Sequence, residues 1–239
     1  MTLTDRIILT IGTHPEGLAT SDLMALLQEE SHFPESSSFT IVSRLIREGR
    51  IRKDRHLLYP GSGFKPVFHI IPDEKTRKLF TDLKAALPFT RISIWHTDAI
   101  LPLMHDIPNI QLTIVGAERL AASTVTDTLE NLTDSLILQD SENSLLLRLA
   151  AGRELVVVTP QVSQAPIEIS EGVTVPSLEK ILVDILSDNF LYALTGSEAY
   201  SIYAAAFDRY AVSRKTLLLY AGRRNRTEAV NTILKEIEK

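Results

Sequence analysis

Three short helical patterns followed by a basic hairpin occupy the first sixty residues, and this order constrains the fold more than any other feature of the chain. Helices are expected over residues 3–13 and 20–30, where apolar side chains recur at helical spacing. The second of these segments begins with Thr-Ser-Asp, which is typical of a helix start. The side chains expected to face inward are Ile7, Ile8, Ile11, Leu23, Leu26 and Leu27.

A third helix is expected to begin in the polar run 35–38 and to end at Gly49. Its buried side chains are expected to be Phe39, Val42, Leu45 and Ile46. Its outward face is expected to present small hydroxyl groups near the start of the helix and guanidinium groups further on. These outward residues are Ser37, Thr40, Ser43, Arg44 and Arg47.

Two β-like pieces, 50–53 and 57–59, follow the third helix and predict a hairpin that places Arg52, Lys53 and Arg55 near a phosphate backbone. The order of helix, helix, polar-faced helix and basic hairpin predicts a winged helix-turn-helix that binds double-stranded DNA over residues 1–62. Two alternatives stay open. The basic run can be a solvated face of a small helical domain, or the winged helix can be a protein-interaction module.

Strand and helix patterns alternate beyond a Gly-Ser-Gly junction at residue 61, and they predict a larger α/β domain over residues 66–239. Strands are expected at 67–71, 91–95, 110–115, 135–138 and 154–158, and helices at 73–87, 97–105, 118–132 and 142–151. This alternation favours a largely parallel sheet. Further helices are expected at 175–186, 197–210, 213–222 and from 227 onward. The expected fold class is mixed α/β with a helical C-terminal portion.

The net charge of −5 argues against a protein that coats nucleic acid by bulk electrostatics. Basic residues nevertheless gather in two segments, 44–55 and 209–226, on this acidic background. The chain has no cysteine, which excludes disulfides, thiolate metal sites and cysteine nucleophiles. Neither a signal peptide nor a membrane-spanning run is evident, so a cytoplasmic protein without a membrane partner is expected.

No motif for catalysis, nucleotide binding or metal binding is present, and neither an enzyme, a cofactor nor a metal is expected. The six histidines lack the spacing of metal ligands. Charged residues in two later helices form the remaining candidates: Glu179, Lys180, Asp184, Arg223 and Arg224. They are interpreted either as partner contacts or as a structural ion-pair network. A weaker alternative is an enzyme of unrecognised class centred on the first three.

Three later motifs, together with the expected winged helix, resemble the AbiEi-type antitoxins of bacterial type IV toxin-antitoxin systems. The motifs are Trp-His-Thr at 95–97, Pro-Ser-Leu-Glu-Lys-Ile-Leu-Val-Asp at 176–184 and Tyr-Ala-Gly-Arg-Arg at 220–224. The resemblance implies a transcriptional regulator whose N-terminal domain binds its own promoter and represses its operon. It also implies a C-terminal domain that counteracts a nucleotidyltransferase-like toxin.

Overall fold

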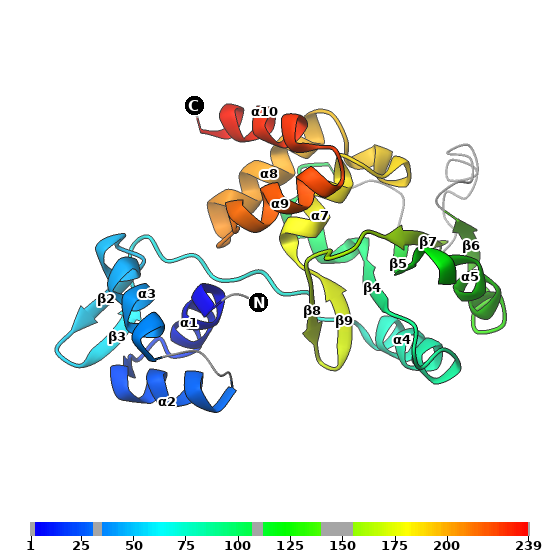
Figure 1. Cartoon of the computed structure of the whole chain (residues 1–239). Coiled ribbons are helices and arrows are strands. Elements are labelled where there is room, and N and C mark those ends of the chain that lie inside the picture. The colour runs from blue at the N-terminus through cyan, green and yellow to red at the C-terminus, as the bar shows by residue number, and fades with distance from the viewer. Residues whose placement is uncertain (1–2, 31–34, 107–111, 140–154, 239) are drawn as a thin grey trace. The chain divides into compact units, whose positions relative to one another are not determined.

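The computed structural model describes residues 3–30, 35–106, 112–139 and 155–238, and they form a mixed helix-and-strand protein (Figure 1). The chain divides into two compact units. The first unit is Met1–Phe68 together with Arg209–Ala211, and the second is His69–Asp208 with Val212–Lys239. Among the described residues, no helix combines the length and the apolar character needed to cross a bilayer.

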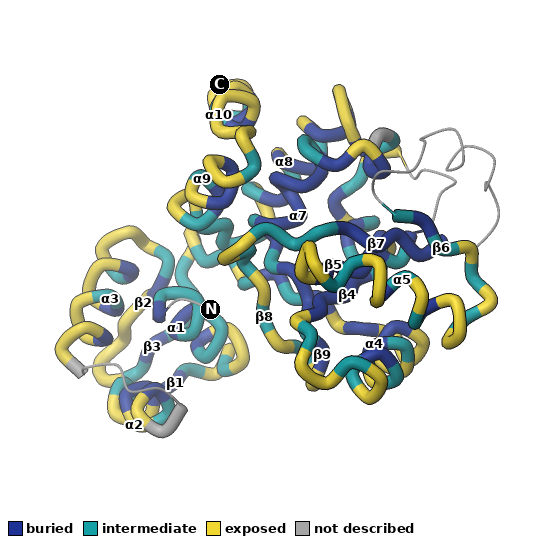
Figure 2. Tube along the Cα trace, turned by 45° about the vertical axis from the view of Figure 1, so that its right-hand side comes forward, coloured by how far each residue is buried: buried dark blue, intermediate teal, exposed yellow. Residues whose placement is uncertain are grey.

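The first unit has the element order α1, β1, α2, α3, β2, β3. The bounds are α1 Leu3–Gly12, β1 Leu18–Ala19, α2 Thr20–Glu30, α3 Glu35–Arg47, β2 Ile51–Asp54 and β3 Leu57–Pro60. The strands form an antiparallel sheet in the order β1-β3-β2. Each helix contributes a buried apolar stripe to one core, as the dark segments of Figure 2 show. The three expected helices and the hairpin are therefore confirmed.

The buried stripe of α3 differs from the expected one by one residue. The structure buries Ser38, which is 2% exposed, with Val42 and Leu45, whereas Phe39 is 44% exposed. The spacing of 38, 42 and 45 is as helical as that of 39, 42 and 45, so periodicity alone could not separate them. Consecutive residues are rotated by about 100° around a helix, and this rotation carries Phe39 to the edge of the stripe. The prediction that Phe39 is buried was wrong.

The second unit is built on a four-stranded sheet in the order β4-β5-β7-β6. The strands are β4 Ile92–His96, β5 Leu112–Glu118, β6 Leu136–Gln139 and β7 Leu155–Gln161. Strands β5, β7 and β6 are parallel, and β4 is antiparallel to β5. The helices α4 (Glu74–Ala86) and α5 (Ala122–Glu130) contact the sheet and each other, so they cover the same face. Preceding α5 is a 3-10 turn, η2 (Arg119–Ala121).

Three expected elements of the second unit are not found in the predicted form among the described residues. Residues 67–71 form no strand, because none of the described strands pairs with them and a strand needs a ladder partner. The helix expected at 97–105 is instead the 3-10 segment η1 (Thr97–Leu103), which contains Pro102. The helix expected at 142–151 lies outside the described residues.

An additional hairpin precedes the helical end of the chain. Its strands are β8 (Ile167–Ser170) and β9 (Val173–Pro176), and its turn residues Glu171 and Gly172 both have positive φ. The sequence patterns did not predict this hairpin. The helices that follow are α7 Leu178–Ile185, η3 Asn189–Leu194, α8 Ser197–Arg209, α9 Arg214–Arg223 and α10 Thr227–Ile237. Helix α9 contacts both α7 and α10.

Candidate nucleic-acid interface

The outward face of α3 is polar except at Phe39, which is 44% exposed. Its exposed polar residues are Ser36, Ser37, Thr40, Ser43, Arg44 and Arg47. This face follows from the buried stripe on the opposite side of the helix, which fixes the rotation of α3 against the core. Most of the hydroxyl groups lie in the first half of the helix, and the guanidinium groups follow Ser43 in the second half.

Two of these side chains have defined partners. The hydroxyl of Thr40 donates a hydrogen bond of 2.9 Å to the backbone carbonyl of Ser36. The Nη2 of Arg44 donates to the hydroxyl of Thr4 at 3.2 Å, and its Nε lies 3.7 Å from a carboxylate oxygen of Glu48. Both members of this ion pair are about half exposed, so its contribution to stability is small. The charge of Arg44 stays accessible to a ligand.

The hairpin of β2 and β3 presents a second basic surface. Its outward residues Arg52, Lys53 and Arg55 are exposed, whereas Ile51 and Leu58 anchor the hairpin in the core. The guanidinium of Arg52 lies over the ring of Tyr59 at 4.8 Å from its centroid. Arg55, at the tip, has a φ of 54°, a left-handed conformation that a non-glycine residue adopts at a cost of about 1 kcal/mol.

Charge is segregated along the first unit. Residues 44–68 contain seven basic and two acidic residues, whereas residues 1–43 contain one basic and six acidic residues. Residues 1–68 are therefore neutral in total, but they have a basic portion formed by the end of α3 and the hairpin. Within this portion, Arg50 is partly buried, and this burial lowers its pKa.

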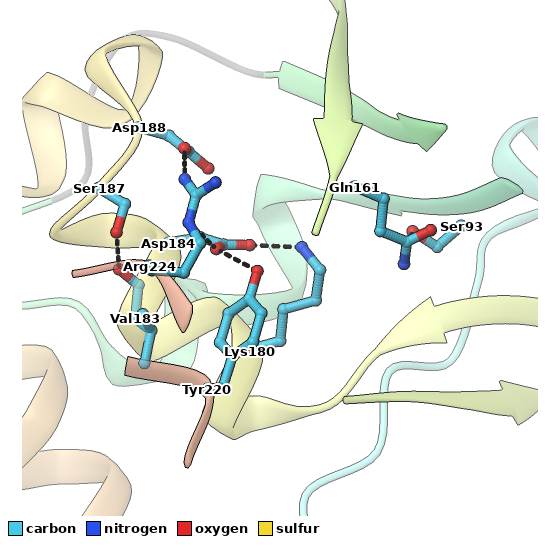
Figure 3. A network of polar contacts seen from close by, with 9 residues as sticks. All are labelled: Ser93, Gln161, Lys180, Val183, Asp184, Ser187, Asp188, Tyr220 and Arg224. Atoms are coloured by element: carbon cyan, nitrogen blue, oxygen red, sulfur yellow. Dashed lines mark hydrogen bonds and ion pairs between the residues drawn. The ribbon is translucent and has the colours of Figure 1, made fainter. Parts of the chain in front are cut away.

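The five candidates of the second unit do not form one cluster. Lys180, Asp184 and Arg224 join in a buried network (Figure 3), in which the carboxylate of Asp184 is paired with the ammonium of Lys180. The hydroxyl of Tyr220 donates to Asp184 at 2.9 Å, and the Nε of Arg224 lies 3.6 Å from the same oxygen. Arg224 also donates to Asp188 through Nη2. Lys180 and Asp184 are only 7% and 8% exposed.

The electrostatics of the network follow from its burial. Burial and the neighbouring carboxylate of Asp184 raise the pKa of Tyr220 far above its usual range. Burial opposes the charge of Arg224, but attraction by Asp188 and Asp184 outweighs it and raises the pKa of Arg224. Two cations and two carboxylates therefore neutralise one another inside the protein. This arrangement is a closed ion-pair network rather than an open reactive site.

Glu179 and Arg223 lie outside this network. Glu179 accepts hydrogen bonds from the backbone N–H of Ser213 at 2.8 Å and from the hydroxyl of Ser177 at 2.7 Å, so it fixes the start of α9. Arg223 is exposed and donates to Ser163 and Gln164. Sequence reasoning missed Asp188 and Tyr220 as members of the network. The available signals were the position of Asp188 one turn beyond Asp184 and the tyrosine of the Tyr-Ala-Gly-Arg-Arg motif.

A cavity of about 280 Å³ lies beside α4 at the end of the main sheet where β4 ends and β5 and β7 begin, and Asp73, His96 and Asp98 are among its lining residues. Asp73 caps α4 by accepting from the N–H of Thr76 at 2.6 Å, and Nδ1 of His96 accepts from the N–H of Asp98 at 3.2 Å. Burial opposes ionisation of Asp73, but the hydrogen bonds from Thr76 prevail and lower its pKa. In the described ranges, no group of three or more histidine, aspartate or glutamate side chains is arranged to hold a metal ion.

Comparison with known families identifies a family that spans most of the chain. Residues 39–239 match the family described as a family of unknown function, DUF6577. The chain belongs to the DUF6577 family. The DUF6577 match begins at Phe39 within α3 and continues through the hairpin and the whole second unit. No curated protein matches the chain.

Proposed function

We propose that this DUF6577 protein is a DNA-binding transcriptional regulator whose first unit acts as a winged helix-turn-helix. The element order α1-β1-α2-α3-β2-β3 and the sheet order β1-β3-β2 support the proposal, since they supply a helix pair followed by a hairpin wing. In this assignment α3 is the recognition helix and the β2–β3 hairpin is the wing.

The polar outward face of α3 is the observation that carries the proposal. A recognition helix must bring its first turns close to base edges, and small hydroxyl side chains such as Ser37, Thr40 and Ser43 permit that approach. Arg44 and Arg47 follow where longer side chains can reach a guanine or a phosphate. The interface combines base contacts from the start of the helix with electrostatic contacts from its end.

The wing supplies sequence-independent contacts in this proposal. Arg52, Lys53 and Arg55 extend the basic portion of the first unit from α3 to the tip of the hairpin. Each phosphate that such a cation neutralises releases condensed counterions from the duplex. Binding is therefore expected to weaken steeply as the salt concentration rises.

A second proposal concerns the operon and the partner. On the resemblance to AbiEi-type antitoxins, the protein represses its own promoter in the cytoplasm, and its second unit counteracts a nucleotidyltransferase-like toxin. Coexpression of an adjacent nucleotidyltransferase-like gene with and without this protein tests the partner. Growth arrest that this protein relieves supports the antitoxin role, whereas an adjacent gene whose product is harmless favours regulation alone.

An enzyme centred on Glu179, Lys180 and Asp184 receives no support from the geometry. Such a site requires charged groups that converge in an open cleft. Lys180 and Asp184 instead neutralise each other in the interior, and Glu179 is engaged by the start of α9. These contacts favour a structural role for the cluster, and we propose no catalytic residue.

Binding of the purified protein to the DNA upstream of its own gene tests the regulator. The upstream duplex and a scrambled duplex are compared at two salt concentrations, with the wild type, an Arg44→Ala/Arg47→Ala variant and an Arg91→Ala control. Arg91 is 85% exposed and lies in the second unit. The double variant is expected to bind at least tenfold more weakly, and its salt slope to fall by about 0.9 for each phosphate that it no longer neutralises.

The control variant is expected to retain wild-type affinity and salt dependence. Equal binding by the double variant and the control would place the interface elsewhere. Absence of binding to either duplex at low salt would contradict the DNA-binding proposal and favour a protein-interaction role for the first unit.

A further inference from the structure

Phe39 is exposed on the helix that is proposed to enter the major groove. The interior side of α3 is closed without it, since Ser38, Val42 and Leu45 are each at most 4% exposed. Phe39 nevertheless leaves 44% of its surface in solvent. An aromatic side chain at this place has apolar surface that a ligand of suitable chemistry can cover.

The helix geometry places Phe39 among the residues that approach base edges. It lies three residues after Ser36 and four before Ser43, both exposed, so the three share one side of α3. Side chains on a helix also lean toward its N-terminus, which is the end of a recognition helix that contacts bases. The guanidinium groups of Arg44 and Arg47 lie further along and are suited to the DNA backbone.

The chemistry of this surface favours one partner. A phenyl ring neither donates nor accepts a conventional hydrogen bond, and the apolar group that base edges present in the major groove is the C5-methyl of thymine. The neighbouring Thr40 has already committed its hydroxyl hydrogen to the carbonyl of Ser36, which leaves its methyl group and an acceptor for the DNA. The first turns of α3 are thus partly apolar in character.

We infer that Phe39 contacts the C5-methyl group of a thymine in the DNA site and contributes to sequence preference there. This inference rests on the proposed DNA-binding function and identifies one feature of the sequence that the protein prefers. The complementary basic surfaces of α3 and the hairpin hold the duplex, while Phe39 distinguishes thymine from bases that lack the methyl group.

Replacement of thymine by deoxyuridine tests the inference, because it removes the methyl group and leaves base pairing intact. Each thymine within the stretch of the upstream duplex that the bound protein protects from nuclease digestion is replaced in turn. Removal of one buried methyl group is expected to weaken wild-type binding about fourfold at one position. The Phe39→Ala variant is expected to bind the thymine duplex more weakly and to be indifferent to the replacement, whereas Phe39→Leu retains part of the discrimination.

Phe89→Ala is the matched control, since Phe89 is 97% exposed and lies in the second unit. It is expected to show the same fourfold response as the wild type. Thermal unfolding and light scattering check that Phe39→Ala keeps the wild-type melting temperature and oligomeric state. Equal binding of thymine and deoxyuridine duplexes by the wild type, or a response that persists in Phe39→Ala, would overturn the inference while leaving DNA binding intact. A change in oligomeric state would also overturn it, and absence of binding to any duplex would overturn both proposals.

Discussion

Substitution of Asp184 by asparagine tests whether the buried ion-pair network stabilises the fold. Asparagine keeps the shape of the side chain but removes its charge. The ammonium of Lys180, which is 7% exposed, then loses its counterion in the interior. Breaking a buried pair from one side costs about 3–5 kcal/mol. That loss is a large fraction of the roughly 5–15 kcal/mol that stabilises a typical domain.

The converse substitution, Lys180→Met, is expected to cost much less. Methionine fills a similar volume with an unbranched apolar chain. Asp184 then retains the hydroxyl of Tyr220 at 2.9 Å and the guanidinium of Arg224. Because the remaining carboxylate is still compensated, we expect a loss of about 1–2 kcal/mol. The predicted order of destabilisation is Asp184→Asn well above Lys180→Met.

The single tryptophan of the chain provides the assay. Trp95 is buried in β4 of the second unit, so its fluorescence reports the unfolding of that unit in urea. The exposed Glu130→Gln change on α5 serves as a charge-removing control and is expected to leave the unfolding free energy within about 0.5 kcal/mol of the wild type. Equal losses for the two network variants, or a loss below about 1 kcal/mol for Asp184→Asn, would refute the network argument.

Two further predictions concern Asp73 and Arg55. Because the folded protein lowers the pKa of Asp73, its ionised form contributes stability above about pH 4 that is lost as the pH falls through the folded-state pKa. Asp73→Asn keeps a capping side chain, so its unfolding free energy, measured in urea from pH 5 to pH 2, is expected to fall less steeply; parallel pH profiles would contradict this. Arg55→Gly removes a charge but relieves the left-handed strain at this position. We therefore expect its DNA affinity to fall without a loss of melting temperature. Arg55→Asn is expected to show the same two effects. A lower melting temperature for both Arg55 variants would contradict the prediction that they relieve strain.

The first unit was largely predictable from the sequence because its signals are local. The residues that specify each helix, such as the helix start at Thr20 and the members of a hydrophobic repeat, lie within a few positions of one another in the sequence. The misplaced Phe39 shows the limit of this method. Two stripes that differ only in their first residue have the same periodicity, and only packing against the rest of the core decides which one is buried.

The second unit was less predictable because its decisive contacts join distant residues. Arg224 meets Asp188 across 36 positions of sequence, and no local pattern encodes that pairing. The β8–β9 hairpin is short, and its exposed Ile167 and Ile169 reverse the usual position of apolar side chains. Conversely, the apolar run 67–71 met the criteria for a strand, yet strands require a ladder partner that composition does not supply.

The two basic segments look alike in the sequence, but the fold withdraws one cation of the later segment, Arg224, from solvent. In the segment 209–226, Arg224 is neutralised by buried carboxylates, whereas Arg214 and Glu238 form a half-exposed pair. In the segment 44–55, the pair of Arg44 with Glu48 is half exposed and the hairpin cations face solvent. Affinity for DNA depends on the phosphates that a local surface can neutralise rather than on net charge. The net charge of −5 therefore does not argue against the DNA binding proposed for the first unit.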